Sequence, residues 1–223
     1  MNPNELRRAM SAGIAFVVLV VVGTIVSLAN APNISSKDTD AQAAQKYVQQ
    51  LSSSGHRAGL IIGAYLLVLA ALAFVWFTLG LRARVTSVPA GRLIAGLGVL
   101  GASALAAAGM ASASVAGPVS FGNQPVPQNG DSIEIVMDLT FPFICVVFAL
   151  VSAALLAVYA VDSYRSGRRD WIARTAWFGV LGGVFAVIFI PLVLPLLWYL
   201  AVAITGVMRP AVSGTGAAER VAS

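Results

Sequence analysis

Charged residues are scarce in this sequence. Only 10% of its 223 residues are Asp, Glu, Lys or Arg, and 58% are hydrophobic. Charged residues make up about a quarter of a typical soluble domain. The composition therefore excludes an ordinary soluble domain and indicates an integral membrane protein, in contact with the lipid bilayer.

Cysteine and histidine each occur once, as Cys145 and His56. A single cysteine excludes an intramolecular disulfide and a metal site built from cysteines. A single histidine excludes a haem held by two histidines. His56 could sense pH or ligate a metal, but a solvated histidine at the membrane interface is the simpler interpretation. We therefore expect no cofactor.

Common catalytic motifs are also absent. The sequence has no P-loop, no His-Glu-x-x-His, no nucleophile elbow and no dinucleotide fingerprint. Its basic residues lie between apolar runs and form no cluster typical of a nucleic-acid-binding surface. No catalytic residue is identified, nucleic acid is not expected as a partner, and an enzyme is the least favoured class of function.

Long apolar runs predict an all-α transmembrane bundle, because a helix needs about 20 apolar residues to cross a bilayer. Six spans are expected, at about 10–30, 58–81, 93–115, 139–161, 172–190 and 192–208. The first run resembles a secretory signal but is longer than the apolar part of one, so we expect a retained helix. Residues 1–209 would form one domain, and the Gly-, Ala- and Ser-rich residues 210–223 a flexible cytoplasmic tail.

The last apolar run, residues 175–208, contains Pro191 and Pro195 and can be interpreted as one helix or two. One helix of this length would extend about 51 Å, whereas the hydrocarbon core is about 30 Å thick. Two helices that meet near the prolines are favoured, with Trp171 lengthening the fifth span at the interface.

Basic residues are distributed unevenly about these spans. Eleven of the 14 lysines and arginines lie in the terminal segments and in the loops after the second and fourth spans. The other three are Lys37, Lys46 and Arg57. By the positive-inside rule, this pattern predicts a multi-pass protein of the plasma membrane with both termini in the cytoplasm.

The polar segment between the first two spans predicts a short amphipathic helix on the outer side. Ala44, Tyr47, Val48 and Leu51 recur at the spacing of one helix face. A carboxylate at 38 or 40 could cap the start of this helix.

Three carboxylates, Asp131, Glu134 and Asp138, precede the fourth span at spacings that place them on one helix face. Such a face could bind a divalent cation, which prefers several oxygen ligands. Pairing with the basic residues of the other outer segment is the simpler interpretation, so no metal site is assigned.

Two sets of residues are candidates for contacts within or around the bundle. Aromatic residues could contact lipid, a quinone or a partner, or could simply anchor the helices at the interface; they are Trp76, Phe77, Trp171, Trp198 and Tyr199. Small residues recur every fourth position at Gly109, Ala113 and Gly117, a spacing that favours close helix packing in lipid.

The apolar cores of the predicted spans contain no Asp, Glu, Lys, Arg or His. Ion-coupled carriers, proton pumps and voltage sensors normally need such residues at membrane depth. We therefore expect a non-enzymatic accessory or scaffolding subunit of a larger cell-envelope complex, in contact with other membrane subunits or with itself. The alternative is binding or transport of an apolar small molecule or lipid.

The order of these features resembles a group of uncharacterised six-helix membrane proteins from actinobacteria. The basic N-terminus and the segments 40–47, 55–57, 74–82 and 195–198 carry the resemblance. It implies six spans and an actinobacterial source. It implies no activity and no catalytic residue.

The predicted topology can be tested with a reporter that is active only outside the cytoplasm. Fused after Arg209, it should be inactive, because six spans return the chain to the cytoplasm. Fused within residues 31–57, the same reporter should be active. Activity after Arg209 would contradict six spans.

Overall fold

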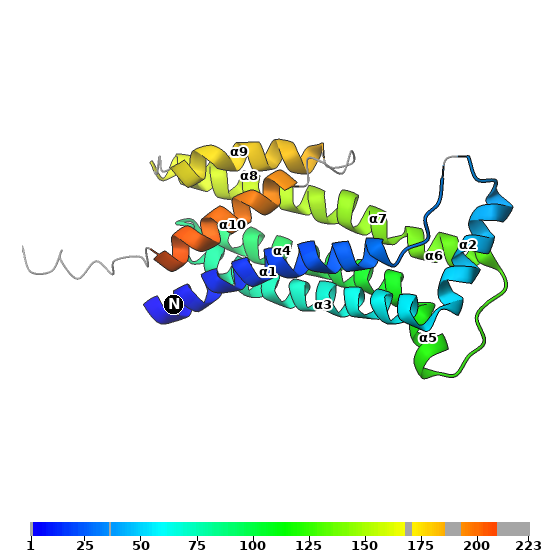
Figure 1. Cartoon of the computed structure of the whole chain (residues 1–223). Helices are drawn as coiled ribbons and strands as arrows, with labels where there is room; N and C mark the ends of the chain where they lie inside the picture. Colours follow the sequence, from blue (N-terminus) through cyan, green and yellow to red (C-terminus); the bar gives the residue numbers. More distant parts are fainter. Residues whose placement is uncertain (1, 36, 168–170, 186–192, 209–223) are drawn as a thin grey trace, which may run out of the picture.

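The computed structural model describes residues 2–35, 37–167, 171–185 and 193–208, and all regular secondary structure in these residues is helical (Figure 1). The predicted all-α class is therefore confirmed. In chain order the helices are α1 (Pro3–Ala29), α2 (Asp40–Ser52), α3 (Ser54–Arg82), α4 (Val88–Ala113), α5 (Ala116–Phe121), α6 (Gly130–Asp138), α7 (Thr140–Pro142), the π-helix η1 (Phe143–Phe148), α8 (Ala149–Arg165), α9 (Trp171–Val184) and α10 (Val193–Met208).

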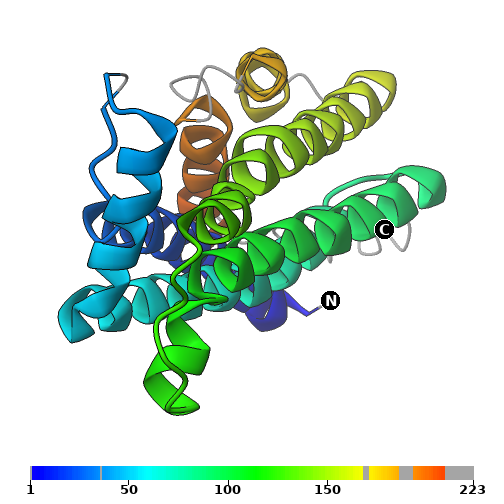
Figure 2. The same cartoon turned by 90° about the vertical axis from the view of Figure 1, so that its right-hand side faces the viewer.

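Four helical stretches are long and apolar enough to cross a membrane. They are α1, α3, α4 and the 36-residue stretch Gly130–Arg165, which runs from α6 to α8. α2 and α5 lie at one end of these long helices, which we call the α2 end (Figures 1 and 2). Each of the four stretches is longer than the corresponding predicted span, because the helix begins four to nine residues before the predicted start.

The last apolar run contains two separate helices, α9 and α10, which contact each other. With 14 and 16 residues they are about 21 and 24 Å long, shorter than a hydrocarbon core of about 30 Å. α10 ends at the same end of the bundle as the N-terminus (Figure 1). Pro195 lies in the first turn of α10, where a proline loses no helical hydrogen bond. Pro191 and the predicted tail, 210–223, lie outside the described residues.

The predicted amphipathic helix is present as α2, which buries Ala43, Tyr47 and Leu51. Its cap differs from the prediction, since Thr39 and Gln42 form a reciprocal capping box. Asp38 instead forms an ion pair with Lys46, with 2.6 Å between Oδ2 and Nζ. This hydrogen bond from Lys46 is the main cause that lowers the pKa of Asp38.

Small residues bring α1 and α3 into close backbone contact. A Cβ at Gly63 of α3 would overlap the Ser27 hydroxyl of α1 and would lie 3.2 Å from the Gly23 carbonyl oxygen. A Cβ at Gly59, one turn earlier, would overlap the Asn30 side chain. Gly23 and Ser27, four positions apart on α1, thus both meet Gly63 of α3, a contact of small residues that favours helix association in lipid.

Aromatic rings fill the middle of the bundle. Phe16 of α1, Phe74 of α3, Phe148 of η1 and Tyr199 of α10 are fully buried. Their ring centroids lie 4.7 Å apart for Phe16 and Phe74, and 5.6 Å apart for Phe74 and Tyr199. Four helices therefore share one aromatic core.

Proline interrupts the fourth long stretch. Pro142 has no backbone N–H to donate to the Asp138 carbonyl, and the π-helix η1 follows it directly. The helical stretch begins at Gly130, earlier than the predicted start near 139, and the distortion follows Pro142. Thr140 does not cap the helix; its hydroxyl donates to the Ala108 carbonyl of α4, at 3.3 Å.

At the other end of this stretch, the buried carboxylate of Asp162 joins α8 to the loop between α3 and α4. Asp162 accepts hydrogen bonds from the backbone N–H groups of Thr86, at 2.9 Å, and Ser87, at 3.1 Å. Ser87 is the N-cap of α4. The end of α8 therefore fixes the start of α4.

The α1–α3 contact can be tested by adding one methyl group. Gly63→Ala should lower the free energy of unfolding by about 1–3 kcal/mol, because the new Cβ would force α1 and α3 apart. Gly96→Ala is the matched control, since a Cβ there would meet nothing within 4 Å. Denaturation in mild detergent micelles measures both, and equal stability of the two variants would contradict the contact.

Candidate functional site

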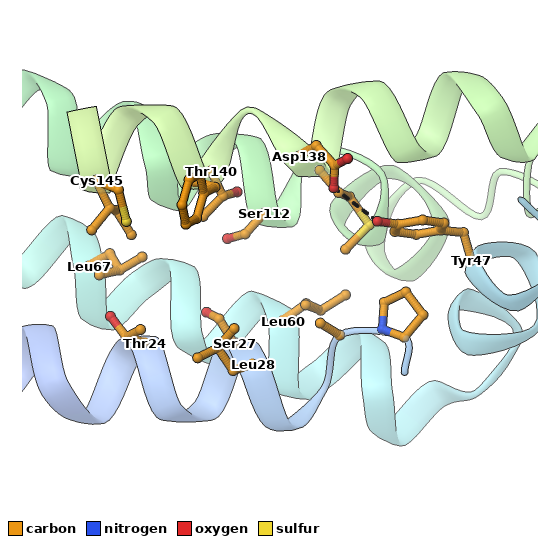
Figure 3. Close-up of a pocket in the computed structure, with 15 residues that line it drawn as sticks. Thr24, Ser27, Leu28, Tyr47, Leu60, Leu67, Ser112, Asp138, Thr140 and Cys145 are labelled. Atoms are coloured by element: carbon orange, nitrogen blue, oxygen red, sulfur yellow. Dashed lines mark hydrogen bonds between the residues drawn. The ribbon is translucent and has the colours of Figure 1, made fainter. Parts of the chain in front are cut away.

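A cavity of about 190 Å³ lies among the long helices near the α2 end; we call it the lateral cavity (Figure 3). α1, α2, α3, α4 and the stretch from α6 to η1 all contribute to it. Most of its lining is apolar. The lining residues are Thr24, Ser27, Leu28, Ala31, Pro32, Tyr47, Leu60, Leu67, Ser112, Met137, Asp138, Thr140, Phe141, Ile144 and Cys145.

The cavity has a buried floor and an exposed mouth. Leu67 and Cys145, at 0% and 1% exposure, form part of the floor. Leu28 of α1 and Phe141 of α7 are 61% and 49% exposed and lie at the mouth. Both are large apolar side chains, so the mouth presents an exposed apolar surface, which is more stable against lipid than against water.

Incomplete coverage by α10 explains why the cavity exists. The extensive contacts of α1 among the described residues are with α3 and α10. α10 packs between α1 and the α8–α9 pair, in the half of the bundle nearer the N-terminus (Figure 1). Toward the α2 end no described helix continues this packing between α1 and η1. The distorted backbone after Pro142 forms the opposite wall.

One buried hydroxyl in the lining has no partner in the described part of the chain. Ser27 Oγ is buried and makes no hydrogen bond there. By contrast, Ser112 donates to the Gly109 carbonyl, at 2.8 Å, and Thr140 donates to α4. An unsatisfied buried hydroxyl is costly in an apolar setting, and this one packs against Gly63 of α3.

A hydrogen bond between α2 and α6 closes the cavity toward the α2 end. The Tyr47 hydroxyl donates to Asp138 Oδ1 at 3.0 Å (Figure 3). Burial is the main cause that raises the pKa of Tyr47 above its ordinary value of 10.0, and the bond to Asp138 adds to it. Tyr47 therefore remains a neutral donor, and α2 is held over the end of the bundle.

The acidic face of α6 has no metal-binding arrangement. Asp131 is exposed, Glu134 is half-buried and Asp138 bonds to Tyr47. In the described residues no three His, Cys, Asp or Glu side chains are placed to hold a metal ion. The basic residues of the opposite segment bond elsewhere: Lys46 pairs with Asp38, and Arg57 donates to the Leu51 carbonyl at 2.6 Å.

The aromatic candidates fall into two groups. Trp76 and Trp171 are 62% and 49% exposed, so lipid or a partner can reach them. Phe77, Trp198 and Tyr199 are buried and pack inside the protein. Trp198 Nε1 donates to the Ile172 carbonyl at 3.1 Å, which joins α10 to α9.

The small-residue candidates are also divided. A Cβ at Gly109 would lie 2.9 Å from the Ala64 carbonyl oxygen, so Gly109 allows α4 to pack closely on α3. Ala113 is half-buried at the end of α4. Gly117 lies in α5, where a Cβ would meet nothing within 4 Å.

The prediction from sequence identified Tyr47 and Asp138 separately but not their bond, and it missed Ser27. Ser27 appears in the sequence as one hydroxyl in an apolar run. Its spacing of four from Gly23 was the available signal, because small residues at this spacing indicate a helix contact.

The Tyr47–Asp138 bond leads to a pH-dependent prediction. At pH 7, Tyr47→Phe should lower the free energy of unfolding by about 1 kcal/mol. Above pH 10 the unfolded chain releases the Tyr47 proton while the folded protein keeps it, so the advantage of the wild type should shrink as pH rises. Chemical denaturation of both proteins from pH 7 to 11 measures this difference, and a constant difference would contradict the raised pKa.

Comparison with protein-family models, with curated proteins and with solved structures found no match. The resemblance to six-helix actinobacterial proteins stays a prediction. The case for a function therefore depends on the geometry of the lateral cavity.

Proposed function

We propose that the protein binds an apolar molecule, a hydrocarbon chain of a lipid, in the lateral cavity. The observation that carries this proposal is the cavity itself, with an apolar mouth at Leu28 and Phe141 and a buried hydroxyl at Ser27. The cavity needs no buried charge to accept such a ligand, in keeping with a function that involves no ion coupling.

The size of the cavity limits the ligand. At about 190 Å³ it is somewhat larger than an engineered cavity of roughly 150 Å³ that holds benzene. It is smaller than the roughly 300–1,000 Å³ typical of sites for drug-sized ligands. The cavity therefore suits one segment of a hydrocarbon chain, with the rest of the molecule extending past the mouth.

For the topology, we propose six spans in the plasma membrane with both termini in the cytoplasm. Seven described arginines support this orientation, because they lie together at the end of the bundle opposite α2, which we call the arginine-rich end. They are Arg7, Arg8, Arg82, Arg84, Arg92, Arg165 and Arg174. In this orientation the lateral cavity opens to the outer leaflet.

An accessory role in a larger envelope complex is a second proposal. Exposed apolar side chains near the α2 end support it, because such surfaces commonly contact a partner or a membrane. Phe121 of α5 and Ile135 of α6 are 75% and 67% exposed near the α2 end.

The lipid proposal predicts the effect of filling the cavity. Native mass spectrometry of the protein extracted in mild detergent should show bound lipid on the wild type. Thr24→Trp should reduce this lipid to background, because the indole would occupy the cavity. Val21→Trp is the matched control, since Val21 is 42% exposed on the same helix and does not line the cavity.

Equal lipid on both variants would contradict the cavity as the binding site. The same spectra distinguish the second proposal, since an accessory subunit should retain a partner protein in fixed stoichiometry. A single species with lipid and no partner protein would favour lipid binding alone.

A further inference from the structure

A second hollow lies on the surface at the arginine-rich end, between the start of α1 and the end of α3. Its volume is about 710 Å³, and it is more open than the lateral cavity. We call it the arginine groove. It is lined by Glu5, Arg8, Trp76, Leu79, Arg82 and Ala83. None of these residues lines the lateral cavity.

Two guanidinium groups give this groove its charge. Arg8 and Arg82 are exposed, and neither side chain makes a hydrogen bond or ion pair with another residue in the described ranges. The one carboxylate in the groove is already engaged: Glu5 Oε2 accepts from the backbone N–H of Asn2, at 3.0 Å, in the capping box of α1. The groove therefore presents two guanidinium cations, and its one carboxylate is engaged in capping α1.

Along α3, the apolar residues of the groove, Trp76 and Leu79, lie farther from the arginine-rich end than Arg82 does. Trp76 is 62% exposed, and Trp76, Leu79 and Arg82 follow one another at intervals of three residues, on neighbouring positions of the helix surface. Arg82 follows Trp76 by six positions, which corresponds to about 9 Å along the helix axis. A tryptophan at the membrane interface with an arginine about 9 Å nearer to water matches the order of chain, glycerol and phosphate in a phospholipid.

We propose that the arginine groove binds an anionic phospholipid, with its phosphate between Arg8 and Arg82 and its glycerol and upper chains against Trp76 and Leu79. Arginine suits this role because its planar guanidinium donates paired hydrogen bonds to phosphate oxygens. Two arginines on different helices would then be joined through one lipid. This site is independent of the lateral cavity, which lies toward the opposite end of the bundle.

The experiment uses brominated lipids, which quench tryptophan fluorescence on contact. The full-length protein is reconstituted into phosphatidylcholine vesicles containing a small fraction of brominated phosphatidylglycerol or, separately, brominated phosphatidylcholine. The signal of Trp76 is the difference between the wild type and Trp76→Phe, a change at an exposed ring that leaves the core intact. The quenching of Trp76 should show a preference of roughly tenfold for phosphatidylglycerol.

The double variant Arg8→Gln and Arg82→Gln should abolish this preference. Arg92→Gln combined with Arg174→Gln is the matched control, since it removes the same charge from exposed positions at the same end and outside the groove. The control should keep the preference. Each variant is compared with its own Trp76→Phe derivative, and circular dichroism checks that the helices are retained.

Three results would overturn the proposal. The first is equal quenching of wild-type Trp76 by the two brominated lipids. The second is loss of the preference in the control as well as in the groove variant, which would indicate only general attraction to a basic surface. The third is a preference that survives in the groove variant. Loss of lipid from the lateral cavity in Thr24→Trp bears on none of these, so the two proposals can fail separately.

Discussion

The close approach of α1 and α3 is the constraint on which the rest of the bundle depends. Lipid gives little hydrophobic drive for helices to associate, so the favourable free energy of association has to come from close van der Waals packing. Gly63 facing Ser27, and Gly59 facing Asn30, bring two long helices together over their half nearest α2. The aromatic core then forms where the same helices meet η1 and α10. A larger residue at the glycine contact would displace both the core and the wall of the lateral cavity.

The lateral cavity follows from this packing combined with two local features. α10 covers the space beside α1 only in the half of the bundle nearer the N-terminus, and Pro142 prevents the facing helix from remaining a regular α-helix. The same Ser27 that packs against Gly63 leaves its hydroxyl without a partner in the described residues. Ser27 thus belongs both to the α1–α3 contact and to the lining of the lateral cavity, so a change at Ser27 would affect both.

Much of the architecture could be predicted from the sequence because apolar runs and helix periodicity are local signals. They identified the long helices, and the spacing around Tyr47 identified α2. Contacts between distant segments gave no such signal: Tyr47 and Asp138 are 91 positions apart, and nothing in either segment marks the other as its partner. For the same reason, the sequence could not tell whether Trp198 and Tyr199 contact lipid or pack inside the bundle, since an aromatic residue near a helix end has the same local sequence in either case; both are buried. The number of spans stays a prediction, because α9 and α10 are each shorter than a full crossing.

The bonds made by Asp162 also have a consequence for the order of synthesis. Its backbone partners, Thr86 and Ser87, precede it in the chain by 76 and 75 residues. At typical translation rates this separation corresponds to roughly 4–15 s. During that time the N–H groups of Thr86 and Ser87, just before the first residue of α4, lack this acceptor. The helical hairpin of α3 and α4 therefore emerges from the ribosome with one end unfinished, and a residue made much later completes it.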